Sequence, residues 1–271
     1  MISEANQLWY FGRHIADFLK IPHILRIHSI RGLYAKTIIK AYKWSNRNLV
    51  KLLKEIGKCP ISMLHALALA QVSDYTITLT YIEERFLRRY LIRNVSTVEG
   101  TYVSFPEEVE APAFRLDDQQ QYVLVVKSPP SILSLIKHKI NLPVISRGST
   151  ILRNYVSTSK WASLIKGSLI IVRPSIYSSG LPVGLVEALA YGKVMLTTSA
   201  VASKLKGLRN WTHIIVEDDF AKYPSIINLI AKNEELRRHI EINARYYFEK
   251  HLNLMKHCEK LERVLYSTLH Y

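Results

Sequence analysis

The stretch that decides the fold is Ile171–Thr198, which reads IVRPSIYSSGLPVGLVEALAYGKVMLTT. It contains an apolar run, a polar turn closed by Gly180 and Pro182, a run with helical spacing, and a second apolar run after Gly192. This order predicts strand, loop, helix and strand. The first turn of such a helix has free backbone N–H groups and the positive end of the helix dipole, which together favour an anionic group such as phosphate.

Glu187 is the only acidic residue in this stretch. It falls one or two turns into the predicted helix, too late to act as its cap. A carboxylate in that position is well placed to accept hydrogen bonds from the hydroxyls of a bound nucleotide or sugar. We therefore interpret Glu187 as a ligand-binding residue.

The same residues resemble the donor-binding motif of the family-four glycosyltransferases, which are retaining enzymes with a B-type fold of two Rossmann-like domains. The matching positions are Pro174-Ser175, Ser179-Gly180-Leu181-Pro182 and Glu187 to Lys193. That family usually has two glutamates eight positions apart, and here Ser179 stands in the first position and Glu187 in the second. Because the second glutamate holds the nucleotide ribose in the family, the resemblance implies that donor binding is retained. The replacement of the first glutamate by Ser179 bears on catalytic turnover and not on donor binding.

The resemblance also implies roles for residues outside the motif. Catalytic roles fall on His28, which would face the donor sugar, and on Lys127 and Arg147, which would neutralise the leaving diphosphate. The donor-binding set is Gly148, Arg173, Ser179, Gly180, Leu181, Val183 and Glu187. Clustered aspartates that could hold a metal ion are absent from the sequence, so a metal-independent enzyme without a cofactor is expected.

Composition indicates a folded globular protein with an anionic partner. The chain has 271 residues and a formal net charge of +15, so nucleotide phosphates, an anionic membrane or nucleic acid are candidate partners. The only cysteines are Cys59 and Cys258, in no metal-binding or redox spacing, which indicates a reducing compartment without disulfides. The N-terminus lacks the apolar core of a signal peptide, and no apolar run approaches the ~20 residues of a membrane span. We expect a cytoplasmic protein, at most peripheral at a membrane.

The order of predicted elements indicates an α/β protein with two Rossmann-like domains. The proline-rich, acidic stretch 106–121 is interpreted as a linker, with residues 1–115 forming an acceptor-side domain and residues 116–271 the nucleotide-sugar domain. Residues 3–20 are expected to form a helix capped by Ser3, so the first domain would start on a helix and be shortened. A separate helix is expected at 61–71, after a break at 57–60. The last helix, 252–269, is expected to cross back to the first domain, as in the B-type fold.

A stripe of basic residues marks the region from Leu33 to Lys58. At helical spacing the following side chains fall on one face: Lys36, Lys40, Lys43, Arg47, Lys51 and Lys54. Such a face could lie on an anionic membrane, be merely solvated, or bind nucleic acid. Residues 45–48 resemble a break between two helices.

These features predict transfer of a sugar from a UDP- or GDP-linked donor to an acceptor with retention of configuration. The shortened first domain leaves three possibilities for the acceptor site: it is reduced, it is completed by another subunit of a homo-oligomer, or a membrane presents the acceptor. Two alternatives stay open, a non-catalytic binding or assembly module and a basic nucleic-acid-binding protein.

Overall fold

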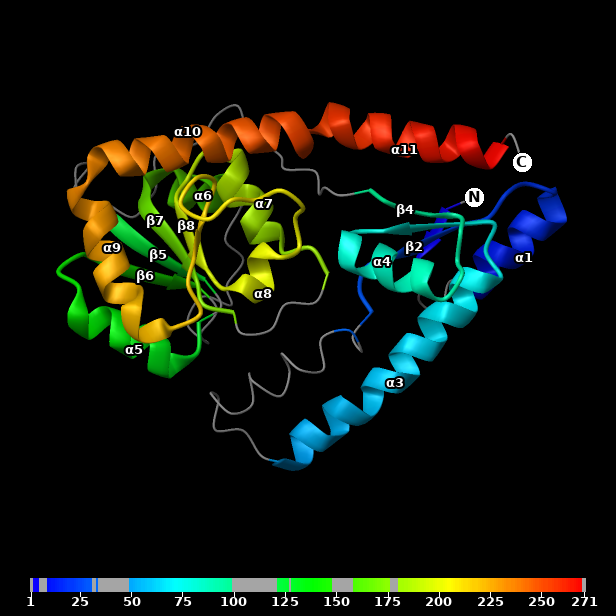
Figure 1. Ribbon diagram of the computed structural model, residues 1–271, viewed down its shortest axis with the longest axis horizontal. Helices are drawn as coiled ribbons and strands as arrows, with labels where there is room; N and C mark the ends of the chain where they lie inside the picture. The colour runs from blue at the N-terminus through cyan, green and yellow to red at the C-terminus, as the bar shows by residue number, and fades with distance from the viewer. Residues whose placement is uncertain are drawn as a thin grey trace.

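Two parallel β-sheets, each built from one half of the chain, organise the structure (Figure 1). This computed structural model describes residues 2–4, 9–30, 33, 49–98, 121–126, 128–147, 158–175 and 180–269. Within these ranges strands alternate with helices, as the sequence predicts for an α/β protein. The predicted linker at 106–121 and the boundary near residue 115 lie almost entirely outside the described residues.

The first sheet has the strand order β1-β2-β3-β4 and is parallel throughout. Its strands are β1 (Ile2–Glu4), β2 (Ile24–Ile27), β3 (Tyr75–Thr78) and β4 (Val95–Thr97), and its helices are α1 (Trp9–Leu19), α3 (Leu49–Gln71) and α4 (Tyr81–Arg89). One core joins Leu25 and Ile27 of β2 to Leu69 of α3 and Leu87 of α4. Burial of these apolar side chains covers one face of the sheet.

Two expectations about this half of the chain are wrong. The first described element is strand β1, in which Ile2 pairs with Ile24, and Ser3 is therefore a strand residue and not a helix cap. A strand of three residues is too short to show a period in the sequence, and it forms only because β2 supplies its partners. The predicted break at 57–60 is also absent, since α3 continues through Pro60. Proline disfavours a helix interior, but the buried face from Cys59 to Ala70 stabilises the whole helix by packing.

The second sheet has the order β6-β5-β7-β8-β9 and is also parallel throughout. Its strands are β5 (Tyr122–Val126), β6 (Val144–Arg147), β7 (Ser168–Arg173), β8 (Met195–Thr197) and β9 (Ile215–Val216). Successive residues of β5 and β7 enter different cores: Leu124 and Ile171 pack on one face, Val123 and Ile170 on the other. Burial on both faces explains why these strands are continuous apolar runs.

Helices cover both faces of the second sheet. One face carries α5 (Pro130–Lys139) and α9 (Tyr223–Lys232); the other carries α6 (Thr158–Gly167), α7 (Val183–Ala190) and part of α10 (Glu234–His251). A short helix α8 (Ser199–Ala202) follows β8, and a 3₁₀ turn at Phe220–Lys222 precedes α9. Gly192 has a φ of +60°, a left-handed conformation that ends the α7 turn and leads into β8.

The last two helices run along both halves of the molecule (Figure 1). α11 (Leu254–Leu269) places Val264 in one hydrophobic cluster with Ile24, Ile77 and Val98 of the first half. The C-terminal helix therefore closes the face of the first sheet opposite α3 and α4, and it connects the two halves by apolar packing.

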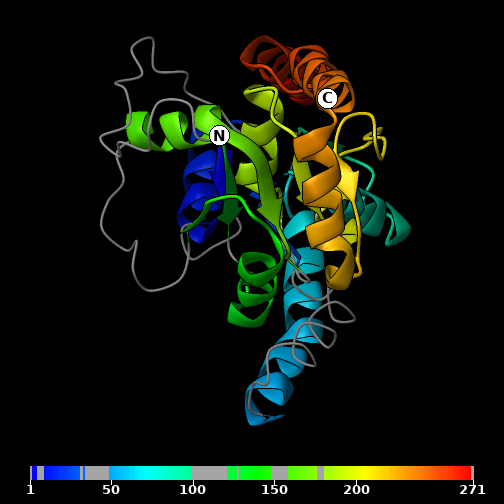
Figure 2. The ribbon, with the colours of Figure 1, turned by 90° about the vertical axis from the view of Figure 1, so that its left-hand side faces the viewer.

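α3 projects from the body of the molecule in both ribbon views (Figures 1 and 2). Of the basic stripe, Lys54 lies in α3 with an exposed side chain and Lys51 lies in the first turn of the same helix. Lys36, Lys40, Lys43 and Arg47 lie outside the described residues. Among the described helices, none is long and apolar enough to cross a lipid bilayer.

Candidate functional site

The candidate site lies at the carboxyl end of β7, where Gly180 and Pro182 lead into the N-terminus of α7. Pro182 precedes the first turn of α7, and Leu185 N–H donates to its carbonyl at 2.8 Å. The first backbone N–H groups of a helix have no partner within the helix, so this end favours an anion. Val183, the first residue of α7, is 49% exposed, which leaves the helix N-terminus open to a ligand.

Glu187 is held in place by a residue that the sequence analysis did not single out. Trp161 of α6 donates its indole Nε1–H to Glu187 Oε1 at 3.0 Å. The other oxygen, Oε2, faces the first turn of α7, since it would lie 3.9 Å from a Cβ added at Gly184. One carboxylate oxygen is therefore used for positioning while the other points to where the ligand would meet the helix. No sequence motif connects Trp161 to Glu187, so only the fold reveals this pair.

Arg173 brings a buried positive charge to the same place. It is the last residue of β7 and only 8% exposed. Its Nη1 lies 3.1 Å from the position of a Cβ built on Gly184, so the guanidinium reaches the first turn of α7. Burial lowers the pKa of Arg173, and the nearby Glu187 carboxylate opposes this effect. Among the described residues, no acceptor pairs with its buried Nε. A buried cation whose Nε has no acceptor among the described residues suits an anionic ligand.

Gly180 brings the motif loop against the first half of the chain. Its φ is +64°, and a Cβ built there would lie 2.6 Å from the backbone oxygen of His28. Only glycine permits both this conformation and this approach. His28 directly follows β2 and its side chain is exposed. The structure thus places His28 and the motif loop next to each other.

The other expected site residues are only partly described. Arg147 is the last residue of β6, paired with Val126 of β5, so its backbone lies at the same sheet edge as Arg173. Leu181 is buried in the core of the second half, where it anchors the loop. Lys127, Gly148 and Ser179 lie outside the described residues, as does the side chain of Arg147.

Two further contacts join the halves beside this site. Leu79, which follows β3, belongs to the same hydrophobic cluster as Leu181 and Leu185. Lys204, just after α8, is 1% exposed and interacts electrostatically with Glu83 of α4, which is fully buried. Burial lowers the pKa of Lys204 to about 8, although the Glu83 carboxylate acts in the opposite direction. The carboxyl edges of the two sheets are therefore packed against each other by apolar and charged contacts.

Groups of three or more His, Cys, Asp or Glu side chains able to hold a metal ion are not found in the described part of the chain.

Comparison with known proteins identifies the fold. No protein-family model and no curated protein sequence matches the chain. Among solved structures it is similar to Anabaena HepE in complex with UDP-glucose, with a TM-score of 0.70, 12% identity, and coverage of 98% of this chain and 78% of that one. The corresponding values for sucrose-phosphate synthase from Thermosynechococcus elongatus are 0.66, 15%, 99% and 73%. For the UDP-forming α,α-trehalose-phosphate synthase from Burkholderia vietnamiensis they are 0.64, 10%, 99% and 74%. The chain therefore has the α/β fold with parallel sheets of the B-type glycosyltransferases.

Proposed function

We propose that the protein is a retaining glycosyltransferase that transfers a sugar from a UDP-linked donor to an acceptor hydroxyl without a metal ion. The observation that carries this proposal is the convergence of three features at one sheet edge: the open N-terminus of α7, the buried Arg173 and the carboxylate of Glu187. UDP is favoured because HepE is solved with UDP-glucose and the trehalose-phosphate synthase is UDP-forming.

Each group has a role in this proposal. Glu187 accepts hydrogen bonds from the ribose hydroxyls, and Trp161 positions its carboxylate. The diphosphate lies at the N-terminus of α7, where the helix dipole and Arg173 stabilise its charge. Lys127, which follows β5 in the sequence, and Arg147, the last residue of β6, would add positive charge beside the diphosphate, and His28 would face the transferred sugar.

The reaction needs electrostatic stabilisation more than a protein nucleophile. The bond from the anomeric carbon to the β-phosphate oxygen breaks and its electron pair leaves with UDP. The acceptor hydroxyl oxygen forms the new bond on the same face of the sugar, and its proton passes to the departing phosphate. Positive charge beside the diphosphate lowers the barrier because negative charge develops there.

Replacing Glu187 with glutamine is expected to weaken UDP binding about 10–100-fold. Glutamine keeps an acceptor for Trp161 but loses the charge that strengthens hydrogen bonds to the ribose, which are worth about 1.5–3 kcal/mol each. Isothermal titration calorimetry with UDP and UDP-glucose measures the change.

Glu235→Gln, at an exposed position of α10, is the matched control and should bind UDP as the unchanged protein does. Equal affinity of Glu187→Gln and the control would contradict the assignment of Glu187. Binding of UDP-glucose without hydrolysis or transfer to any acceptor would instead favour the non-catalytic binding module.

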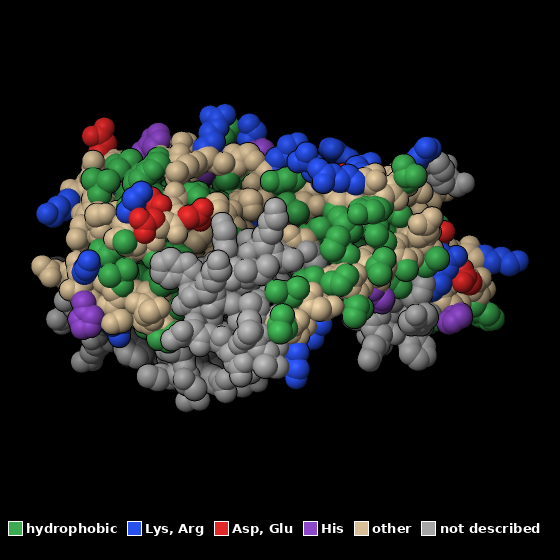
Figure 3. Space-filling model, turned by 60° about the horizontal axis from the view of Figure 1, so that its bottom comes forward, with side chains coloured by type: hydrophobic (Ala, Val, Ile, Leu, Met, Phe, Trp, Pro, Cys, Tyr) green, Lys and Arg blue, Asp and Glu red, His purple; other side chains and the backbone are tan. Residues whose placement is uncertain are grey.

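We further propose that α3 docks the protein on an anionic membrane. Three large apolar side chains of α3 are exposed to solvent: Leu53 is 60% exposed, Ile61 68% and Leu64 67%. Exposed Lys54 and Lys58 lie on the same helix, and hydrophobic side chains gather along this face with basic groups near them (Figure 3). An apolar stripe beside lysines, on a projecting helix of a protein with net charge +15, suits the surface of an anionic bilayer.

The variant Ile61→Ser/Leu64→Ser is expected to lose flotation with anionic liposomes. Burial of each aliphatic side chain in the interface contributes on the order of 1 kcal/mol, so two substitutions lower partitioning by about tenfold or more. Leu229→Ser/Ile242→Ser removes exposed apolar side chains from α9 and α10 and serves as control. If the unchanged protein fails to float, or both variants float equally well, α3 is not the membrane-binding element.

A further inference from the structure

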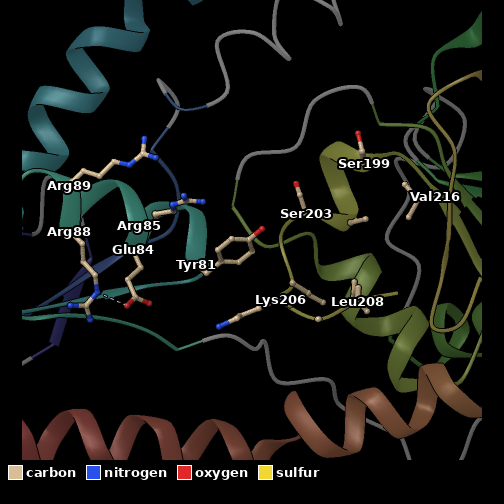
Figure 4. A pocket seen from close by; sticks show the side chains of 13 residues that line it. Tyr81, Glu84, Arg85, Arg88, Arg89, Ser199, Ser203, Lys206, Leu208 and Val216 are labelled. Carbon is tan, nitrogen blue, oxygen red and sulfur yellow. Dashed lines mark hydrogen bonds and ion pairs between the residues drawn. The ribbon is translucent and has the colours of Figure 1, made fainter. Parts of the chain in front are cut away.

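A pocket lies between the two halves, beside the donor-binding motif. It has a volume of about 810 Å³ and lies between α4 and the segment from α8 to Leu208 (Figure 4). On one side of the pocket, Tyr81 comes after β3, which is paired with β2, the strand that His28 follows. On the other side, Ser199 comes after β8, which is paired with β7, the strand that ends at Arg173. The pocket is therefore displaced from the donor motif by one strand in each sheet. Adjacent strands are about 4.8 Å apart, so a ligand here would lie next to the transferred sugar.

The lining of this pocket carries an excess of positive charge. It includes Arg85, Arg88, Arg89 and Lys206 but only one acid, Glu84. Both carboxylate oxygens of Glu84 already accept hydrogen bonds. Oε1 accepts from Arg88 Nε at 2.8 Å, and Oε2 accepts from the Thr97 backbone N–H at 2.9 Å and from the Thr97 hydroxyl at 2.6 Å.

Three cations remain for a ligand once Glu84 and Arg88 are paired. Arg85, Arg89 and Lys206 are exposed, and their side chains form no ion pair or hydrogen bond within the described part of the chain. In the close-up, Lys206 extends towards α4, and the Tyr81 ring lies between the two sides (Figure 4). Like charges gathered around one pocket repel each other, and an anion bound between them removes that repulsion.

The remaining walls indicate what kind of molecule carries the anion. Leu208 and Val216 give the pocket an apolar side, while Tyr81 and Ser203 contribute hydroxyl groups. The two serine hydroxyls are less available than that of Tyr81, since Ser199 Oγ donates to Asp218 Oδ2 at 2.6 Å and Ser203 Oγ donates to the Ala200 carbonyl at 3.4 Å. The planar guanidinium group of arginine can donate two parallel hydrogen bonds to the oxygens of a phosphate group. A phosphomonoester dianion also neutralises more of the positive charge of Arg85, Arg89 and Lys206 than a single carboxylate would. The volume is that of a small-molecule site.

We propose that this pocket binds the phosphate group of a phosphorylated acceptor, through Arg85, Arg89 and Lys206. Naming the ligand as the acceptor rests on the glycosyltransferase function proposed above; the phosphate site itself does not. A soluble sugar phosphate and a phosphomonoester lipid headgroup share the chemistry that the pocket recognises.

The test is calorimetry on the full chain with glucose 6-phosphate, glucose and glucuronate, together with sedimentation of vesicles containing phosphatidic acid. Glucose 6-phosphate is expected to bind more tightly than glucose or glucuronate, and more weakly as salt is raised. Arg85→Gln/Arg89→Gln is expected to weaken this binding at least tenfold, because each charge-assisted contact is worth about a factor of ten or more. Binding of phosphatidic acid vesicles alone, abolished by the same substitutions, would identify the lipid as the source of the phosphate.

The matched control is Arg238→Gln, which removes an exposed arginine of α10 far along the chain from the pocket. The proposal is overturned if neither phosphate probe binds, if glucuronate binds as tightly as glucose 6-phosphate, or if the control loses as much affinity as the pocket variant. UDP affinity is measured in every variant. Loss of glucose 6-phosphate binding with unchanged UDP binding separates this pocket from the donor site. Absence of UDP binding with intact glucose 6-phosphate binding would reject the glycosyltransferase and leave the phosphate site standing.

Discussion

Lys204→Met is expected to lower the free energy of unfolding by about 3–5 kcal/mol, a larger cost than most single substitutions produce. Lys204 is 1% exposed and Glu83 is fully buried, and the two belong to opposite halves of the molecule. Methionine fills similar space, so the loss comes from the Glu83 carboxylate, which stays buried but loses the positive charge of Lys204. Urea denaturation at about pH 7 measures the change.

A double-mutant cycle shows whether the loss of stability in Lys204→Met comes from its interaction with Glu83. Glu83→Met/Lys204→Met is expected to recover most of the stability, because two apolar side chains can replace a buried ion pair at little cost. Lys206→Met, two residues further on and exposed, is the control and should change stability by less than about 0.5 kcal/mol. Additive losses in the double variant would contradict a direct interaction between Glu83 and Lys204.

The pH dependence of stability gives a second measure of the same lysine. Its pKa is about 8 in the folded protein and near its ordinary value of 10.5 when unfolded. Between these values the unfolded chain binds more protons, so the contribution of Lys204 to stability rises with pH through that window and is lowest below about pH 8. Glu83→Met/Lys204→Met should lose this rise.

The second half of the fold could be predicted closely from sequence, and the first half less well. Strands β5 and β7 are buried on both faces, so each appears as an apolar run whose limits are visible without a structure. β1 has three residues and depends on pairing with β2, and α3 contains Pro60 within its span. In both cases contacts distant in sequence stabilise an element that local preferences argue against.

The motif within Ile171–Thr198 is recognisable because its residues are consecutive in sequence. Gly180 and Glu187 belong to one loop and one helix, so spacing alone points to them. Trp161, Lys204 and Arg85 come from other elements, and their importance appears only when the fold brings α6 to α7 and α4 to α8. A tryptophan or arginine on a predicted helix has no pattern that distinguishes it from a core or surface residue.

Gly180→Ala is expected to destabilise the protein and to weaken UDP-glucose binding, because alanine meets two obstacles there. The left-handed conformation, with a φ of +64°, costs a non-glycine residue about 1–2 kcal/mol. The new Cβ would also lie 2.6 Å from the backbone oxygen of His28, which overpacks the contact and adds roughly 1–3 kcal/mol. Moving the loop away from His28 relieves the contact but displaces the entrance to α7, where the diphosphate is proposed to bind.

Gly207→Ala separates these two costs. Gly207 has a φ of +86°, and a Cβ built there meets no described heavy atom within 4 Å. Its replacement should therefore cost only the backbone strain and leave UDP-glucose affinity unchanged. Denaturation and calorimetry on both variants give the difference that belongs to the contact with His28. If the two alanine variants lose equal stability and bind UDP-glucose equally well, the motif loop does not press against the end of β2. If Gly180→Ala loses both more stability than Gly207→Ala and its affinity for UDP-glucose, the contact between the two halves holds the proposed donor site in its binding conformation.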